Sequence, residues 1–454
     1  MKIAWFTPFS RNSAIGCYSK LACEALKKYH DVTIYANNSE DLLQSSVNVE
    51  NFKGKDIVKQ LSDYDEVFYN LGDNSHFHAE IFEVASNFSG VIILHDVTYL
   101  NFITNYYIHY LNQQDEYKKL ISQYYGEDAS NTILNAVNSF EDWNNIDFLY
   151  YNCLDIVTKK AKGAIVHSYY HKTILSKSYF GPIHVLYFPY ISKPSKTLVR
   201  KKSGKYLQLL TVGNVNHNKR IAQIIKAIGG DEKLRSNIKY TVAGRLDNGS
   251  YEKKLRELIK ENKLENSIYL EGPVSVERLD SLYEEAEVIA NLRNPAIEGA
   301  SWSLVEQMDI AKPIIVTNIG FYSEIPDVCL VKLVDDADSE IENIRKVLLW
   351  IMDNLEEANK IAQKAKEYLH KNFSPDNYTK GFEEFLDHLA FLEPIEELMD
   401  QLIFEMAFAG ITSDLQICST VSEEMEKMFS GHKALSDKTN AEVINAENKH
   451  TFSQ

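Results

Sequence analysis

The sequence is short of cysteine, and it has no long apolar run. Only five of its 454 residues are cysteine, an odd number, and none of them forms a Cys-x-x-Cys pair. A disulfide framework is therefore a poor expectation, and we predict reduced thiols in a reducing compartment. No run of about 18 apolar residues occurs, and no apolar signal core follows the first lysine, so we predict neither a membrane span nor an export signal. We expect a cytoplasmic protein and leave open peripheral contact with the inner membrane face.

An excess of positive charge is also missing. The chain has 48 Lys and Arg against 64 Asp and Glu, which gives a formal net charge of −16. Proteins that follow a nucleic-acid backbone need a basic face, so nucleic acid is a poor expectation for a partner. An acidic chain can still contain a basic pocket, and a small phosphorylated ligand stays open.

What the sequence does contain is two series of short apolar strands separated by helical stretches. This pattern predicts parallel sheets that are covered on both faces. We therefore predict an α/β fold of two doubly wound, Rossmann-like domains, 1–190 and 206–373, which face a cleft. Ligands of such sheets bind outside the carboxyl ends of the strands. The expected strands are Lys2–Phe6, Val32–Tyr35, Glu66–Tyr69, Val91–Leu94, Gly163–Val166, Leu207–Val212, Tyr240–Ala243, Ser267–Leu270, Val288–Leu292, Pro313–Thr317 and Cys329–Leu333.

Several segments fall outside the two strand series. Residues 99–162 are too long and too helical for a connection, and we predict a tyrosine-rich helical insertion there. Residues 191–205 are basic and contain proline and glycine, which suits an exposed linker. A helix is predicted at 374–390 and a helical extension at 391–429. Residues 430–454 are polar, and we expect a disordered tail.

Two strand-to-helix loops have the composition of phosphate-binding loops. The loop from Pro8 to Ser19 carries Gly16 near the start of the following helix, where backbone amides and the helix dipole attract anions. The loop after the strand 207–212 supplies a glycine and a basic pair, in the residues Gly213, Asn214, Lys219 and Arg220. Each loop alone also fits a plain turn. Two such loops, one in each domain, favour a ligand that contains phosphate.

A third loop carries two carboxylates with seven residues between them. Glu298 lies in the loop after the strand 288–292, and Glu306 lies in the first turns of the next helix. A carboxylate that accepts from two neighbouring hydroxyls is a common way to hold a ribose. The amides near Gly299, Ala300 and Ser301 can face a phosphate. An acidic helix start explains the same residues without a ligand.

Taken together, these stretches resemble glycosyltransferase family 4, the retaining nucleotide-sugar transferases of GT-B fold. Glu298 to Glu306 resembles the paired-glutamate motif of that family, and Gly213 to Arg220 resembles its phosphate-lysine motif. The loop from Ser13, with the stretches Leu94–Val97 and Val166–Ser168, is similar to further signatures. The resemblance covers roughly residues 1 to 389.

The resemblance implies an enzyme that moves a hexose-type sugar from UDP or GDP to a hydroxyl acceptor, without a cofactor or a metal ion. Surface polysaccharide or glycoconjugate synthesis is the implied pathway, with a glycan, lipid-linked or protein acceptor. The implied roles are ribose binding by Glu306, contact with the transferred sugar by Glu298 and His95, diphosphate neutralisation by Lys219, and close backbone approach at Gly16. The departing diphosphate can itself accept the acceptor proton, and the helix at 374–390 resembles one that returns to the first domain.

Two departures from the family pattern keep other functions open. Asn214 stands where many members have an arginine, so Arg220 or Arg245 would have to complete the phosphate contact. One alternative is a non-catalytic GT-B partner in a glycosylation complex, and another is a sugar-nucleotide epimerase. His76 and His78 fit a metal pair only with a third ligand, and none is suggested nearby.

Overall fold

The computed structural model describes residues 1–37, 41–137, 139, 142–143, 145–192, 204–246 and 249–408. Most of the predicted linker and the residues after 408 lie outside these ranges. The chain divides into two compact units, Met1–Phe385 and Leu386–Gln454. Both sheets belong to the first unit, and the second contributes the later part of one helix to the described residues.

The first sheet is fully parallel and has seven strands in the order β3-β2-β1-β4-β5-β6-β7. Its strands are β1 (Lys2–Thr7), β2 (Asp31–Ala36), β3 (Asn48–Asn51), β4 (Glu66–Leu71), β5 (Gly90–Leu94), β6 (Ala161–Val166) and β7 (Ile183–Val185). The helices of this half are α1 (Ala14–Leu26), α2 (Val58–Leu61), α3 (Ser75–Asn87), α4 (Leu100–Asn105), the π-helix η1 (Tyr106–Tyr110), α5 (Gln114–Tyr125), α6 (Glu127–Ala136), α8 (Leu154–Val157) and α9 (Tyr169–Leu175).

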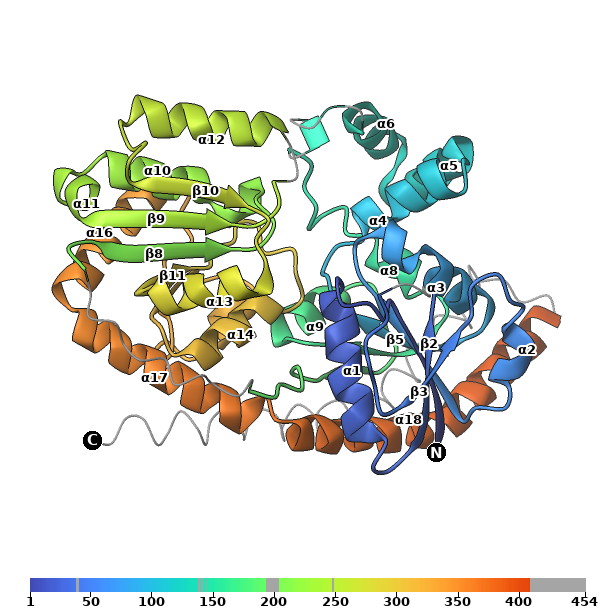
Figure 1. Cartoon of the computed structure of the whole chain (residues 1–454). Helices are drawn as coiled ribbons and strands as arrows, with labels where there is room; N and C mark the ends of the chain where they lie inside the picture. Colours follow the sequence, from blue (N-terminus) through green and yellow to red (C-terminus); the bar gives the residue numbers. More distant parts are fainter. Residues whose placement is uncertain are drawn as a thin grey trace, which may run out of the picture. The chain divides into compact units, whose positions relative to one another are not determined.

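The second sheet is also parallel, with six strands in the order β10-β9-β8-β11-β12-β13 (Figure 1). Its strands are β8 (Leu207–Val212), β9 (Ile238–Ala243), β10 (Ile268–Gly272), β11 (Val288–Ala290), β12 (Ile314–Thr317) and β13 (Val331–Leu333). The helices are the 3₁₀ turn η2 (His217–Lys219), α10 (Ile221–Gly229), α11 (Glu232–Asn237), α12 (Gly249–Glu261), α13 (Val276–Glu285), α14 (Trp302–Ile310), α15 (Phe321–Glu324), α16 (Glu340–Asp353), α17 (Leu355–Asn372) and α18 (Pro375–Phe408).

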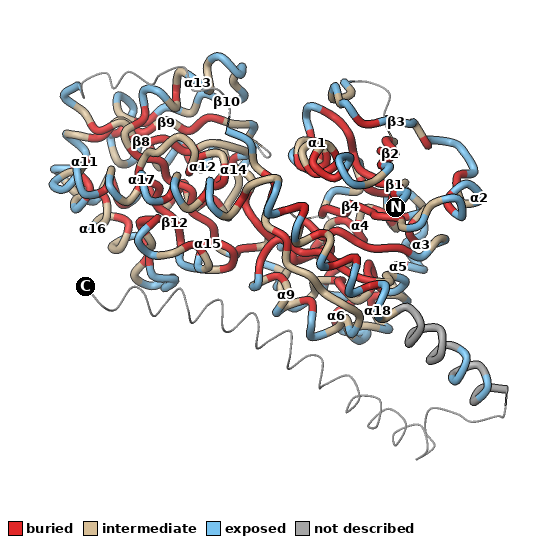
Figure 2. Tube along the Cα trace, turned by 90° about the horizontal axis from the view of Figure 1, so that it is seen from below, coloured by how far each residue is buried: buried red, intermediate tan, exposed pale blue. Residues whose placement is uncertain are grey.

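Alternation along the strands explains why helices cover both faces of each sheet. In β8, Leu209 joins the core cluster formed with α10, α12 and α16, and Leu210 joins a smaller cluster with Leu282 of α13. Successive side chains of a strand point to opposite faces, so two apolar faces need two helical layers. The central strands are accordingly buried, whereas the edge strands β3, β7 and β10 are partly exposed, as are the outer sides of the helices (Figure 2). The predicted pair of doubly wound domains, with a helical insertion and a helical C-terminal extension, is confirmed.

The start of α18 packs against the first sheet. The Phe382 ring lies 6.2 Å from Trp5 and 5.0 Å from Phe68, centroid to centroid, and the hydroxyls of Tyr378 and Tyr18 are 2.6 Å apart. The helix therefore carries the chain from the second sheet back to the first. It runs without a break at 390, so the predicted helix at 374–390 and the start of the predicted extension are one helix, and residues 409–429 of that extension lie outside the described residues. In the described part of the chain, no helix is long and apolar enough to cross a bilayer.

Candidate functional site

Each of the two predicted phosphate loops follows a strand at which the strand order of its sheet reverses direction. In the second sheet β8 lies between β9 and β11, and in the first sheet β1 lies between β2 and β4. At such a reversal two adjacent strands, β8 and β11 or β1 and β4, are followed by connections that run in opposite directions. This opens a crevice at the carboxyl ends of the two strands. The loops after β8 and β11 are the ones that carry Lys219 and Glu298. The fold thus places these two loops at the same edge of the sheet, although Lys219 and Glu298 are 79 positions apart in the sequence.

Lys219 lies over the end of β8, and Gly213 makes room for it. The Lys219 Nζ donates to the Val212 carbonyl at 2.9 Å, and the residue is 5% exposed. Gly213 has a φ of +104°, and a Cβ there would lie 3.0 Å from Nζ. Glycine adopts this backbone conformation without strain, and it leaves the ammonium in place. The structure therefore places a buried cation at the carboxyl end of β8, and its contact with a phosphate stays a prediction.

A backbone hydrogen bond joins the lysine loop to the glutamate loop. The amide of Asn294 donates to the carbonyl of Asn218 at 2.9 Å. Asn218 precedes Lys219, and Asn294 follows β11 by four residues. The two loops therefore flank the same switch point as neighbours.

Glu298 is held by two side chains that the sequence did not single out. Its Oε1 accepts from the Arg293 guanidinium and from the Tyr322 hydroxyl at 3.0 Å. Arg293 is 6% exposed and also donates to Asn291 Oδ1 and to the Leu292 carbonyl, both at 2.9 Å. Burial lowers the pKa of Arg293, but the Glu298 carboxylate raises it, and the net change is upward. This network fixes the orientation of the first glutamate.

Glu306 lies in the second turn of α14, which Ser301 begins. The Ser301 Oγ accepts from the Leu304 amide at 3.4 Å, the usual N-cap bond. Burial and the Glu306 charge both raise the pKa of Tyr190 and of Tyr283, so Glu306 lies near both phenols. At the same helix start Trp302 packs on Phe188 with ring centroids 5.6 Å apart. The second glutamate thus sits at a junction of aromatic side chains from both sheets.

Two expected phosphate contacts have other partners in the structure. The Gly299 amide donates to the His95 carbonyl at 2.8 Å, so the expectation that this amide faces a phosphate is wrong. Arg220 forms a bidentate ion pair with Glu340, with Nε–Oε1 at 2.8 Å. A guanidinium whose charge is already matched is a weaker diphosphate ligand than Lys219. Asn214 is exposed, and Ala300 is buried before α14.

In the first sheet, Gly16 is needed by its own loop. It lies in the first turn of α1, and its amide donates to Ser13 Oγ at 3.1 Å. A Cβ at Gly16 would lie 2.6 Å from the Pro8 carbonyl oxygen. The close approach that the sequence predicted is therefore made by the backbone of residues 8–10. Contact with a ligand stays a prediction.

His95 follows β5 and is almost fully buried. Asn70 donates its side-chain amide to the Phe6 carbonyl at 2.9 Å, so its Oδ1 faces His95 Nε2 at 3.0 Å. Nε2 must then carry the proton, and Nδ1 is left as an acceptor. Burial, followed by the charges of the neighbouring histidines, holds the pKa of His95 well below its ordinary value. The imidazole is neutral at physiological pH.

Loops of the two sheets are bonded to each other at this point. Val97 N donates to Ile297 O at 3.0 Å, beside the bond from Gly299 to His95. Tyr170 of α9 donates its hydroxyl to the Ala296 carbonyl at 3.1 Å. The Ser168 hydroxyl donates to the Gly299 carbonyl. The glutamate loop is therefore anchored to the first sheet as well as to its own.

His171 of α9 is buried beside this loop, and neither of its ring nitrogens has a partner. Burial lowers its pKa to about 3, against about 6.5 in an unfolded chain. The unfolded state therefore binds a proton first as the pH falls, and stability is lost between about pH 6.5 and 3. We expect His171→Leu to be at least as stable as the unchanged chain at pH 7 and to lose less stability at pH 5. Urea unfolding at both pH values measures this, and an equal loss in both proteins would contradict it.

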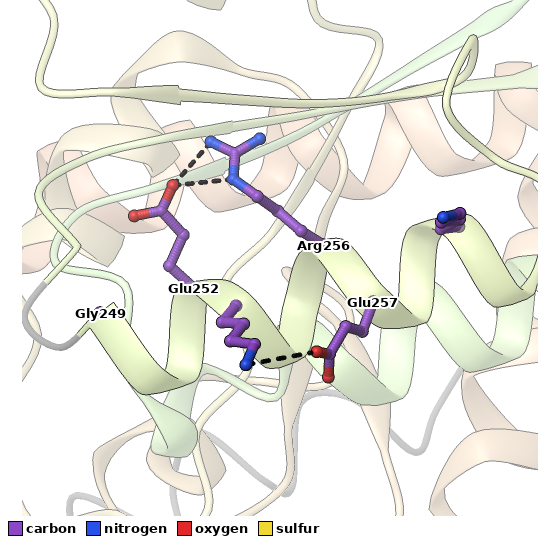
Figure 3. Close-up of a pocket in the computed structure, with 6 residues that line it drawn as sticks. Gly249, Glu252, Arg256 and Glu257 are labelled. Carbon is purple, nitrogen blue, oxygen red and sulfur yellow. Dashed lines mark hydrogen bonds and ion pairs between the residues drawn. The ribbon is translucent and has the colours of Figure 1, made fainter.

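Other polar groups give weaker sites. His78 donates Nδ1 to the Asn70 carbonyl at 3.0 Å and is buried, whereas His76 lies at the start of α3. Within the described ranges, no three His, Cys, Asp or Glu side chains group as metal ligands. A shallow depression of 340 Å³ lies along α12. Among the side chains that line it, Glu252 pairs with Arg256 (Figure 3) and Lys253 pairs with Glu257. Charges paired within one helix face need no ligand.

Comparison with known families gives a match within the second half of the chain. Residues 195–368, less than half of the chain, match the family described as glycosyl transferases group 1. A search of curated proteins finds no match to the sequence.

Solved structures share the fold over most of the chain. HepE of Anabaena, in complex with UDP and glucose, has a TM-score of 0.59 at 15% identity, over 86% of this chain and all of that one. Sucrose-phosphate synthase of Thermosynechococcus elongatus gives 0.58 at 13% identity, over 86% and 99%. WaaG, a glycosyltransferase involved in lipopolysaccharide biosynthesis, gives 0.53 at 15% identity, over 84% and 98%. The fold is therefore GT-B.

Proposed function

We propose that the protein is a nucleotide-sugar glycosyltransferase, because residues 195–368 match the glycosyl transferases group 1 family and the fold is GT-B. It would move a hexose-type sugar from UDP or GDP to a hydroxyl acceptor, with retention of configuration. The observation that carries the proposal is the buried Lys219 at the switch point, in a loop bonded to the glutamate loop.

The donor would lie with its diphosphate at the carboxyl end of β8. Lys219 supplies the positive charge, and an ammonium carries three donors, so its bond to Val212 is compatible with phosphate contacts. Glu306, on the helix that follows, would accept from the ribose hydroxyls. Glu298, oriented by Arg293, would accept from the sugar hydroxyls, and His95 would meet the sugar as a neutral acceptor through Nδ1.

The main catalytic task of the protein would be to stabilise the departing diphosphate. Negative charge grows on the diphosphate as the sugar leaves, and a fixed cation in a dry site stabilises it more than water does. Lys219 and the start of α14 would supply this stabilisation, so we propose catalysis without a metal ion. No protein nucleophile is needed if the acceptor attacks from the face that the diphosphate leaves.

The neighbouring structures support a uridine donor. HepE, which shares the fold, is described in complexes with UDP and with UDP-glucose. WaaG is described as acting in lipopolysaccharide biosynthesis, which supports surface polysaccharide or glycoconjugate synthesis as the pathway. An acceptor at a lipid surface would agree with peripheral membrane contact.

Calorimetry with UDP and GDP tests the proposal directly. We expect one of them to bind in the micromolar to millimolar range, and Glu306→Ala to weaken it about tenfold or more, since a charge-assisted bond contributes roughly 1.5–3 kcal/mol. Release of the same diphosphate from UDP-glucose or GDP-mannose in water measures turnover. Glu284→Ala, at an exposed position of α13, is the matched control. Absence of binding at millimolar ligand would contradict the proposal.

A non-catalytic role is the second candidate. Asn214 is exposed where many related enzymes have an arginine, and Arg220 is paired with Glu340. Both observations fit a donor site with a reduced phosphate contact. The same calorimetry separates the two functions, because a partner protein with a decayed site would bind neither diphosphate.

A further inference from the structure

Asp96 and Glu298 lie directly opposite each other where the loops of the two sheets pair. They form an antiparallel bridge, flanked by the bonds from Val97 to Ile297 and from Gly299 to His95. Both hydrogen bonds lie outside the Asp96–Glu298 pair, which makes it the non-hydrogen-bonded kind. In such a pair the side chains lie on the same face and at their closest separation. The fold therefore sets two carboxyl groups side by side, one from each sheet.

The face that carries the two carboxyl groups is the more open one. On the other face, a Cβ at Gly299 would meet the ring of His171, so α9 covers that side. The Glu298 side chain keeps 26% of its exposure, and Asp96 is half-buried. Both residues therefore keep some exposure, and α9 does not cover the face that carries their side chains.

The two carboxyl groups have different electrostatic surroundings. Glu298 has Arg293 as its counterion. Asp96 has no such ion pair among the described contacts, and its Oδ2 accepts only from the Asp73 amide, at 2.7 Å. Burial raises the pKa of Asp96 to about 7; the Asp73 amide opposes this rise, and the Glu298 charge adds to it.

The elements packed against Asp96 bring further titratable groups close to it, besides Glu298, whose charge raises the pKa of Asp96. The loop after β4 brings the Asp73 carboxyl, itself protonated more readily because of burial and Asp96. His78 of α3 borders the same space over Gly72 and is neutral, since burial lowers its pKa to about 4. Tyr99, on the same loop as Asp96, donates its hydroxyl to Leu71 O at 2.8 Å. The glutamate loop adds Glu298, whose charge Arg293 balances.

We propose that Asp96 is a catalytic carboxylate on the acceptor side, which accepts a hydrogen bond from the attacking hydroxyl and takes its proton. This rests on the proposed function. The hydroxyl oxygen forms a bond to the anomeric carbon, and the bond from that carbon to the diphosphate oxygen breaks. The electron pair leaves with the diphosphate, whose charge Lys219 stabilises, and the proton ends on Asp96. Glu298, paired with Arg293, stays on the sugar hydroxyls.

Water as the acceptor allows a test without the natural acceptor. The probe is UDP-glucose or GDP-mannose, whichever the chain hydrolyses, and the readout is kcat against pH. In the unchanged chain we expect kcat to rise between pH 6 and 8, since Asp96 must be ionised to take a proton. In Asp96→Asn we expect kcat to fall about 100-fold and this rise to vanish, as is usual when a general base is lost. Asp96→Glu should restore part of the rate.

Two further measurements separate catalysis from structure. The Kd for UDP or GDP should change less than about twofold in Asp96→Asn, because the proposed contact is with the acceptor. Asp73→Asn is the matched control: its carboxyl accepts from Asn101 and the Phe102 amide at the start of α4, and the pH dependence should survive there.

The outcomes distinguish this proposal from the function on which it rests. An Asp96→Asn protein that keeps its kcat and its pH dependence would overturn the proposal and favour the diphosphate as proton acceptor. Loss of UDP or GDP binding in the same variant would assign Asp96 to the donor site instead. Absence of binding and turnover in the unchanged chain would overturn the proposed function, and this proposal with it.

Discussion

Lys219→Ala is expected to lower kcat for donor hydrolysis by about 10²–10³-fold, the usual loss when one preorganised donor to a developing anion is removed. The ammonium is already in position over the end of β8, fixed by Val212 and by the glycine beneath it. No reorganisation is then needed when charge develops on the diphosphate. Hydrolysis of UDP-glucose or GDP-mannose, with calorimetry of the free diphosphate, measures both parts of the effect.

The binding part of this effect should be smaller than the catalytic part. A charged hydrogen bond to the ground-state diphosphate contributes roughly 1.5–3 kcal/mol, which corresponds to about 10- to 150-fold in Kd. Lys226→Ala removes an exposed lysine of α10 and should change neither quantity. If Lys219→Ala kept its kcat and its unfolding temperature, the lysine would have no place in the site.

Arg293→Met should reduce the free energy of unfolding by about 3 kcal/mol or more and abolish donor turnover. The substitution leaves the Glu298 carboxylate without its counterion, and breaking a buried ion pair from one side costs about 3–5 kcal/mol. Since Glu298 is partly exposed, the lower end of that range is expected. The hydrogen bonds to Asn291 and Leu292 are lost as well. Urea unfolding followed by tryptophan fluorescence gives the free energy.

A double variant separates the stabilising role of the pair from its role in the site. Arg293→Met with Glu298→Gln removes both charges and should recover much of the stability but none of the turnover. Arg278→Met is the surface control, because Arg278 pairs with Glu271 in the open and such pairs contribute about 1 kcal/mol or less. Equal losses of unfolding free energy in Arg293→Met and Arg278→Met would show that the ion pair of Arg293 with Glu298 contributes no more than a surface pair.

The sequence predicted the central strands of both sheets and missed two strands at sheet edges. Each of the 11 expected strands exists, with ends that differ by a few residues. The two strands that were missed, β3 and β7, lie at the edges of the first sheet. β3 reads Asn-Val-Glu-Asn, and an edge strand with one solvated face does not need an apolar run.

In the candidate site, the sequence predicted residues that belong to a local motif and missed contacts between residues far apart in the chain. The loops that carry Lys219, Glu298 and Glu306 are local patterns, and the sequence located them. Arg220 was expected near a phosphate, but its partner Glu340 is 120 positions away, and no local pattern shows that. Arg293 gave a signal that was overlooked: a lone arginine ends an apolar run, five residues before Glu298. Asp96 could not be recognised, because its neighbour across the bridge lies 202 positions later.

The hydrogen bonds between the glutamate loop and the first sheet determine what a truncated fragment of this protein can retain. A truncated fragment beginning near residue 195 would keep the second sheet and the whole family match. It would lose the groups that Ala296, Ile297 and Gly299 bond to, which belong to Tyr170, Val97, His95 and Ser168. Two recombinant fragments, one with each sheet, should therefore regain sugar-donor hydrolysis only after they reassociate. The loop that holds Glu298 forms hydrogen bonds to residues of the other fragment.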